Sequence, residues 1–308
     1  MGVILNELQT HDTELQTIFE NAIVGGCGFL KNNPMIDNMI LGFSGGIDSC
    51  MTGLLANAVI EKMAKSGRHI GLIGYSLPII TNEDDEIQRA RDAGEVFSSS
   101  FAEVDLSKAY MNLIQAIDNS LFYEMYGHEA ARPEDAKIRA GNIKARMRMM
   151  YLYDKANKYN GVVLSTDNYT ELLLGFWTLH GDVGDFGFLQ ELWKTEVYYL
   201  AEYLAGRGIA TSILEDAINA KPTDGLGVSD SDLDQLLPGW EGSYREGYER
   251  VDKLLRVWEN GELDDDWQDM WDSGMTHDHP VIERHLKTEF KRYNPINLDR
   301  LQLIGLYG

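Results

Sequence analysis

The chain has 308 residues, of which 44% are hydrophobic, so it can bury a core large enough for an α/β domain. Its 49 acidic and 27 basic residues give a formal net charge of −22, which repels nucleic acid and anionic membranes and excludes both as expected partners. The two cysteines, Cys27 and Cys50, have no metal-binding or redox spacing, and no apolar run is long enough for a signal peptide or a membrane span. We therefore expect a cytoplasmic protein.

Helical and strand-like patterns alternate along the first two thirds of the chain. Taken in chain order, the expected elements are a helix over 1–33, a strand over 39–43, a helix over 51–63, a strand over 70–75, a helix beginning at 83–86, a strand over 101–106, a helix over 107–122, a basic helix over 135–158, a strand over 161–165 and a helix over 193–205. Such alternation predicts an α/β fold with a doubly wound parallel sheet and helices on both faces.

The pattern changes after about residue 220. Residues 221–238 are rich in Gly, Asp and Ser and predict a polar loop. Residues 258–279 are acidic with interleaved tryptophans, which fits either a surface insertion or a segment beside a dimer interface. No linker divides the chain, so we expect one domain over 1–308, with an acidic insertion near 258–279.

The clearest chemical pattern lies between the first strand and its following helix, where residues 44–49 read Ser-Gly-Gly-Ile-Asp-Ser. The adjacent glycines let the backbone turn tightly, so that its amides face an anion at the positive end of the helix. The two serines add hydroxyl donors. Asp48 places a carboxylate beside the bound phosphates, which requires a hard cation such as Mg²⁺ between them. The alternative is a plain Ser-Gly-Gly turn before a capped helix, but the full Ser-Gly-Gly-x-Asp-Ser pattern after an apolar strand favours a phosphate-binding loop.

This loop is not a Walker loop, because no Gly-Lys-Ser/Thr follows the glycines, and it resembles the pyrophosphate-binding loop of the ATP pyrophosphatases. Four further segments narrow the resemblance to one family. Ser165 to Glu171, followed by Gly175, Thr178, Gly181-Asp182 and Lys194, resembles the signature of NAD synthetase. The Gly-Asn-x-x-Ala-Arg-x-Arg-Met helix at 141–149 and Lys221-Pro222-Thr223 resemble two other segments of that family, as does Lys291-Arg292 near the carboxyl end.

The resemblance, which spans about residues 39–297, implies the activity and the residues that perform it. NAD synthetases of the ammonia-dependent type use ATP and ammonia to amidate nicotinate adenine dinucleotide, with Mg²⁺ as cofactor, and they act as homodimers. The implied catalytic residues are Asp48, Glu171 and Lys194, of which Asp48 and Glu171 would hold Mg²⁺. The implied ATP-binding residues are Ser44, Gly45, Gly46, Ile47, Asp48, Ser49, Thr166, Lys194 and Thr223. The implied dinucleotide-binding residues are Asn142, Arg146, Asp182 and Lys291, in a site that lies across the dimer interface.

The chain departs from the family pattern at three positions. Ser76 stands where the family has an arginine that contacts ATP, Phe188 replaces a proline, and Phe290 replaces a histidine. These differences bear on the affinity for ATP and on local loop geometry. A glutaminase domain has no room in a chain of this length, so free ammonia is the expected nitrogen source.

Two other functions share parts of this pattern. Another ATP pyrophosphatase, such as a GMP synthetase subunit, would share the phosphate-binding loop, but the Gly-Asn-x-x-Ala-Arg-x-Arg-Met block argues against it. A non-catalytic nucleotide-binding module would share the fold, but binding alone does not need the two carboxylates of Asp48 and Glu171.

Overall fold

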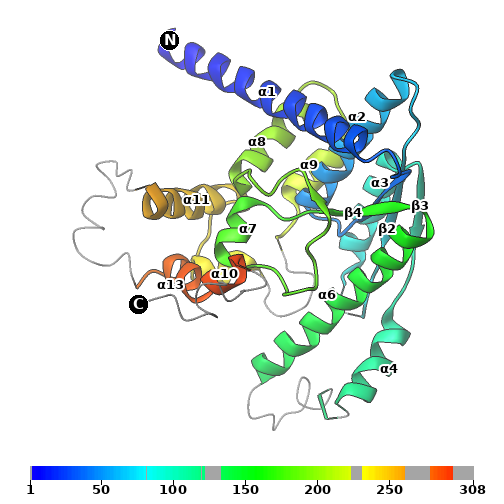
Figure 1. Ribbon diagram of the computed structural model, residues 1–308. Helices are drawn as coiled ribbons and strands as arrows, with labels where there is room; N and C mark the ends of the chain where they lie inside the picture. The colour runs from blue at the N-terminus through cyan, green and yellow to red at the C-terminus, as the bar shows by residue number, and fades with distance from the viewer. Residues whose placement is uncertain are drawn as a thin grey trace, which may run out of the picture.

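A computed structural model describes residues 2–80, 82–118, 120–121, 133–222, 231–260 and 278–293 (Figure 1). Within these residues five parallel strands form one sheet in the order β3-β2-β1-β4-β5. The strands are β1 (Asn38–Gly42), β2 (Gly71–Ser76), β3 (Ser100–Glu103), β4 (Gly161–Ser165) and β5 (Phe186–Gly187). In the register, Asn38 of β1 is paired with Gly71 on one side and with Gly161 on the other.

Helices cover both faces of this sheet, as the alternation predicted. Helices α2 (Ile47–Lys65) and α3 (Asp84–Phe97) pack on one face, and α6 (Pro133–Lys158), with α4 (Ser107–Ile117) against it, packs on the other (Figure 1). Side chains of β1 alternate between the two layers: Met39 and Leu41 belong to the core beneath α2, and Ile40 to the core beneath α6. The doubly wound α/β fold is therefore confirmed.

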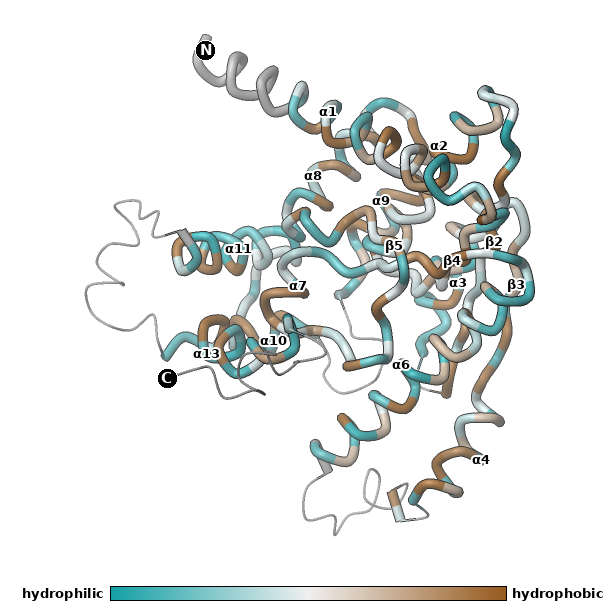
Figure 2. Tube along the Cα trace, viewed as in Figure 1, coloured by the Kyte–Doolittle hydropathy of each residue, from teal (hydrophilic) through white to brown (hydrophobic). Residues whose placement is uncertain are grey.

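A second group of helices packs beside the sheet and completes the large core. It contains α1 (Gly2–Asn32), α7 (Tyr169–Leu174), α8 (Lys194–Ala205), α9 (Thr211–Asn219), α10 (Asp232–Leu236), α11 (Tyr244–Asn260), α13 (Pro280–Lys287) and the 3-10 helix η1 (Glu289–Arg292). Helix α11 contacts both α8 and α7, and Figure 2 shows apolar and polar residues alternating around its axis. Its apolar residues, among them Val251 and Leu255, are buried against the core.

The prediction of a continuous polar loop over 221–238 is wrong in its second part. Ser231 accepts a hydrogen bond from the backbone N–H of Leu233 at 3.2 Å and thereby caps α10, whose Leu233 and Leu236 are buried. Residues 223–230 lie outside the described part of the chain. So do residues 261–277 of the acidic segment, while residues 258–260 form the end of α11. Among the helices that the structure describes, none has the length and apolar character to cross a bilayer.

Candidate functional site

A cleft of about 420 Å³ lies where β1 and β4 diverge at their carboxyl ends. The chain crosses from one half of the sheet to the other between these strands, and ligands of doubly wound proteins bind at such a point because neighbouring loops separate there. Eight of the residues expected at the site line this cleft: Ser44, Asp48, Ser49, Asn142, Thr166, Glu171, Asp182 and Lys291. The structure therefore brings together segments that are more than 200 residues apart in sequence.

The loop at 44–49 joins the end of β1 to the start of α2 and is closed by its own hydroxyl groups. The backbone N–H of Ser44 donates to Ser49 Oγ at 3.2 Å, and Ser49 Oγ donates to the carbonyl of Gly46 at 3.0 Å. Gly45 has a φ of +86°, and a Cβ there would lie 2.3 Å from the carbonyl oxygen of Glu86, so only glycine fits. The first-turn N–H groups of α2 lack acceptors within the helix, which suits an anion at this end.

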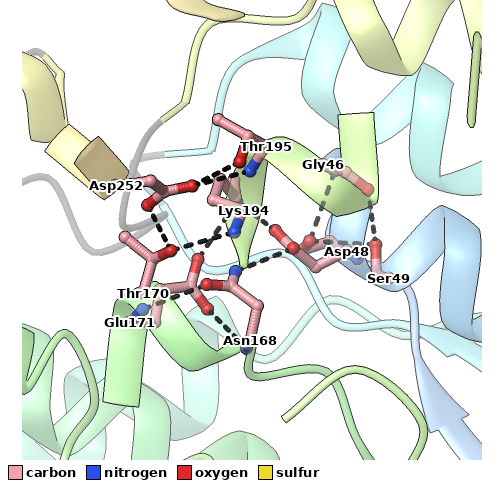
Figure 3. Close-up of polar contacts among 10 residues, drawn as sticks. Gly46, Asp48, Ser49, Asn168, Thr170, Glu171, Lys194, Thr195 and Asp252 are labelled. Atoms are coloured by element: carbon pink, nitrogen blue, oxygen red, sulfur yellow. Dashed lines mark hydrogen bonds and ion pairs between the residues drawn. The ribbon is translucent and has the colours of Figure 1, made fainter. Parts of the chain in front are cut away.

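Lys194 lies under this loop and connects it to the β4 side of the cleft. Its Nζ donates to Asp48 Oδ2 and, at 3.1 Å, to Glu171 Oε1 (Figure 3). The side chain of Lys194 is only 4% exposed, so the ammonium is almost fully desolvated. The three residues expected to be catalytic therefore form one ion cluster, with Lys194 buried beneath the cleft surface and the carboxylates at its edge.

Asn168 aligns the two carboxylates. Its Nδ2 donates to Asp48 Oδ1 at 2.9 Å, and its Oδ1 accepts the backbone N–H of Glu171 at 3.0 Å. Glu171 Oε2 accepts the backbone N–H of Asn168 at 3.3 Å, which completes a capping box at the start of α7. One local helix cap thus positions Glu171 and also reaches across the cleft to Asp48.

Burial and charge act in opposite directions within this cluster. Burial alone would lower the pKa of the Lys194 ammonium, but Asp48 and Glu171 outweigh it and hold that pKa well above its ordinary value. Burial is also the main reason why the pKa of Glu171 is raised, with Lys194 opposing and Asp48 adding to the rise. The carboxylates of Asp48 and Glu171 share the single ammonium of Lys194, so the cluster attracts a further cation.

Asp167 is a cleft residue that the sequence interpretation missed as a functional residue. It is buried, lines the cleft, and accepts a hydrogen bond at 2.7 Å from Ser165 Oγ. Burial, together with the charge of Asp182, raises the pKa of Asp167 to about 7, although the bond from Ser165 opposes the rise. Its place directly after β4, inside the same block as Thr166 and Glu171, was the signal that could have identified it.

The far side of the cleft is built from the loop that follows α7. Both carboxylate oxygens of Asp182 accept the backbone N–H of Thr178, at 2.9 and 3.0 Å. The hydroxyl of Thr178 donates to Asn142 Oδ1 at 2.7 Å, which ties this loop to α6. Burial raises the pKa of Asp182 to about 6, while the bonds from Thr178 oppose it. Asn142 and Asp182 therefore belong to one connected wall.

The two basic residues expected to bind dinucleotide are placed differently. Lys291 lines the cleft and donates to the carbonyls of Gly175 and Trp177 at 2.7 and 2.6 Å, and burial lowers the pKa of its ammonium. Arg146 is directed at the outside of the same loop, where its Nε and a terminal nitrogen donate to the carbonyl of Leu179 at 3.3 and 3.1 Å. Arg146 is not among the residues that line the cleft.

Three other expected residues do not present side chains to the cleft. Gly45 and Gly46 contribute backbone only, and the side chain of Ile47 packs into the core beneath α2. Thr223 lies outside the described residues.

The positions that depart from the family pattern have distinct surroundings. Ser76 is buried and lines the cleft, as does Arg148, whose guanidinium donates to the carbonyl of Leu77 at 3.1 Å and to Asn82 Oδ1 at 2.9 Å. Phe188 packs against the core, and the side chain of Phe290 is exposed. A guanidinium is therefore present near Ser76, but it comes from α6 and stabilises the loop after β2.

The donor set suits a magnesium ion that is bound together with phosphate. Mg²⁺ is usually held by one or two carboxylates, with waters and substrate phosphates completing its coordination. Asp48 and Glu171 supply two such carboxylates at the cleft edge. Among the residues that the structure describes, no cluster of three or more acidic, histidine or cysteine side chains forms a complete protein cage for a metal. The site therefore fits a cation that arrives with a polyphosphate.

Comparison with known sequences points to one family. The sequence model of the family described as NAD synthase matches residues 28–295. The NH(3)-dependent NAD(+) synthetase of Thermoplasma volcanium is 28% identical over 279 residues, covering 88% of this chain and 93% of that protein. The protein of the same description from Stutzerimonas stutzeri is 33% identical over 240 residues, covering 75% of this chain and 83% of its own length.

Solved structures share the fold at lower identity. NMN synthetase from Francisella tularensis superimposes with a TM-score of 0.64 at 22% identity, covering 92% of this chain and 98% of that one. The NH3-dependent NAD synthetase from Campylobacter jejuni gives a TM-score of 0.63 at 20% identity, with 92% and 99% covered.

Proposed function

The chain belongs to the NAD synthase family, whose enzymes are ligases, and we propose that it amidates nicotinate adenine dinucleotide with ammonia at the expense of ATP. The observation that carries the proposal is the ion cluster of Asp48, Glu171 and Lys194 at the divergence of β1 and β4. It links the loop at 44–49, whose amides and hydroxyls suit phosphate, to the loop after β4, and it places a buried ammonium between them.

The proposed reaction has two steps. First, an oxygen of the nicotinate carboxylate attacks the α-phosphorus of ATP, a P–O bond forms, and pyrophosphate leaves with the electron pair of the broken bond. Ammonia then attacks the carbonyl carbon of the acyl-adenylate, AMP leaves, and the nitrogen loses a proton to give the amide. Neither step needs a covalent bond to the protein.

The residues of the chain would bind and orient the reactants rather than react. The loop at 44–49 would hold the phosphates through backbone amides and hydroxyls, and Lys194 would neutralise charge on the leaving pyrophosphate. Thr166 and Thr223 would contact nucleotide, and Asn142, Arg146, Asp182 and Lys291 the dinucleotide. A bound Mg²⁺, held by Asp48 and Glu171, would supply positive charge to the phosphates.

We also propose that the protein is a homodimer in which the partner completes the dinucleotide site. The orientation of Arg146 supports this, because its guanidinium faces the outside of the 178–182 loop, where a second chain could bring substrate. Size-exclusion chromatography with light scattering would give the mass. A monomer that is fully active would contradict the proposal.

The activity is tested by incubating the purified chain with ATP, Mg²⁺, ammonium and nicotinate adenine dinucleotide, and by quantifying products chromatographically. We expect NAD, AMP and pyrophosphate in equal amounts. Release of ADP would refute the adenylation step. Because one structural neighbour is an NMN synthetase, nicotinate mononucleotide should be assayed in parallel, and a higher kcat/KM for it would overturn the assignment of the dinucleotide.

A further inference from the structure

Helix α11 takes no part in the site described so far, yet it reaches the buried side of the Lys194 cluster. Asp252 and Tyr248, one turn apart on this helix, are each only 2% exposed. A buried carboxylate is costly unless it accepts several hydrogen bonds, so the partners of Asp252 indicate what it does.

Asp252 accepts three hydrogen bonds from two threonines (Figure 3). Its Oδ1 accepts the hydroxyl of Thr170 at 2.5 Å, and its Oδ2 accepts both the backbone N–H and the hydroxyl of Thr195, at 2.9 and 2.8 Å. Thr170 lies on α7 and Thr195 in the first turn of α8. Asp252 therefore joins three helices at one point and places negative charge at the positive end of α8.

Each of these threonines is the neighbour of a cluster residue. Thr170 precedes Glu171, and Thr195 follows Lys194. The hydroxyl of Thr170 also accepts the backbone N–H of Lys194 at 2.9 Å, so a continuous chain of hydrogen bonds runs from Asp252 to the backbone of Lys194. The relative position of Glu171 and Lys194 thus depends on a carboxylate that touches neither side chain.

The ring of Tyr248 constrains the side chain of Lys194. The Lys194 Nζ lies 5.4 Å from the centroid of the Tyr248 ring, within the range of a cation–π contact. A lysine side chain has four rotatable methylenes, so an ammonium that serves two carboxylates needs such a wall to stay in place. Helix α11 therefore restrains both the backbone and the side chain of Lys194.

We propose that Asp252 is a positioning residue, which fixes Lys194 against Glu171 and acts on the reaction only through Thr170 and Thr195. The inference rests on the proposed function, since it assigns Asp252 a part in the same reaction. Asparagine would keep only one of the two acceptor oxygens that Asp252 uses, so it cannot accept from both threonines in the same way.

The fold itself gains little from this carboxylate in its ionised form. Burial raises the pKa of Asp252 to about 6 even though Thr170 and Thr195 oppose the rise, so stability falls as the pH rises from about 4 to 6 and the full cost of the ionised form is present above that. In Asp252→Asn, loss of hydrogen bonds is offset in part by removal of a buried charge. A positioning role and a structural role can therefore be separated by measuring turnover and melting temperature together.

The test compares Asp252→Asn with Glu249→Gln. Glu249 is a control on the same helix, because it also accepts a hydrogen bond from α8, from Tyr199 Oη at 2.8 Å, but its half-buried carboxylate is paired with Arg245 and not with the two threonines. We expect Asp252→Asn to lower kcat about 10- to 100-fold, as a displaced catalytic group does, with the KM for dinucleotide within about twofold. Glu249→Gln should leave both constants within about twofold of the parent.

A second pair of variants covers the case in which Asp252→Asn fails to fold. Thr170→Val replaces the hydroxyl with a methyl group at nearly constant shape and should lower kcat. Thr170→Ser keeps the hydroxyl and should have a kcat close to that of the parent. Equal kcat in Asp252→Asn and the parent, or equal losses in Thr170→Val and Thr170→Ser, would overturn the inference.

A crystal structure of Asp252→Asn or Thr170→Val gives a readout that does not depend on the reaction. In the variant, the distance between Lys194 Nζ and Glu171 Oε1 should be longer than the 3.1 Å of the parent. An unchanged distance would refute the positioning role. If the parent makes no amide product, the proposed function fails, and this structural comparison still decides the inference.

Discussion

Replacement of Lys194 by methionine tests whether the ion cluster is held together as the structure indicates. Methionine keeps most of the length of the side chain and removes the charge, which leaves Asp48 and Glu171 facing each other with side chains 16% and 19% exposed. Removing one partner of a buried ion pair typically costs about 3–5 kcal/mol, because the remaining charge is uncompensated. We expect a loss of this size in the free energy of unfolding at pH 8.5.

The loss should be smaller at lower pH. Burial already raises the pKa of Glu171, and Lys194 is the main group that opposes the rise, so the variant should raise this pKa further. Folded Glu171 then holds a proton that the unfolded chain has released, and stability falls with rising pH by about 1.4 kcal/mol per unit up to the folded pKa. Between pH 6 and 8.5 the variant should lose up to about 3.5 kcal/mol, whereas the parent, in which the pKa of Glu171 is about 7, should lose about 1.4 kcal/mol, so the excess loss is up to about 2 kcal/mol.

Urea denaturation followed by tryptophan fluorescence at pH 6 and 8.5 measures both effects. Lys287→Met is the matched control, because Lys287 forms an exposed ion pair with Glu283 and its loss should change stability little at either pH. Adding Glu171→Gln to the Lys194 variant should restore stability at pH 8.5. A pH-independent loss in Lys194→Met, or no rescue by Glu171→Gln, would refute the reasoning.

Three further predictions concern activity. Asp48→Asn and Glu171→Gln should each lower the rate of NAD formation at least about 10-fold, because each removes a negative charge that would hold the cation bound to the triphosphate. A rate within about twofold of the parent would show that the carboxylate is not a metal ligand. Arg146→Ala should raise the KM for dinucleotide about 10- to 100-fold with a much smaller change for ATP, and a loss confined to ATP would mean that α6 serves the other substrate. Ammonium should support turnover and ammonia-free glutamine should not, and equal rates with the two nitrogen sources would contradict this prediction. At limiting ammonium the rate should rise from about pH 7 to 8.5, because NH₃ is the nucleophile.

The sheet could be predicted from sequence because its inner strands are buried on both faces. The apolar runs at 39–43, 70–75 and 161–165 correspond to β1, β2 and β4 within one residue. Strand β5 has only two residues, so no periodicity could reveal it. Helix α7, with six residues, is also too short to show a helical period, although Asn168 and Glu171 already had the spacing of a capping box.

Sequence could predict only those cleft residues that belong to local motifs. The loop at 44–49 and the block at 165–171 each precede a helix and follow a strand, so parallel topology alone brings them together. The pairing of Lys194 with Asp48, 146 residues apart, depends on the packing of α8, which sequence spacing does not encode. Asp252 belongs to no motif, and its role becomes visible only when α11 is placed against α7 and α8.

The direction of Arg146 was another property that sequence could not supply. Its helix was expected, but which side of α6 faces the cleft depends on how α6 packs on the sheet. Asn142 and Arg148 line the cleft, whereas Arg146, between them in sequence, contacts the outer loop at Leu179.

The sharing of one ammonium by two carboxylates makes the two charged ligands of the proposed site cooperative. A triphosphate that binds the ammonium of Lys194 would weaken the ion pairs of Lys194 with Asp48 and Glu171. A divalent cation would then neutralise the two carboxylates. Each ligand then raises the affinity for the other, and thermodynamic reciprocity requires the same factor in both directions. If the proposed site binds both, a protein with a net charge of −22 would admit ATP more readily together with a divalent cation than alone.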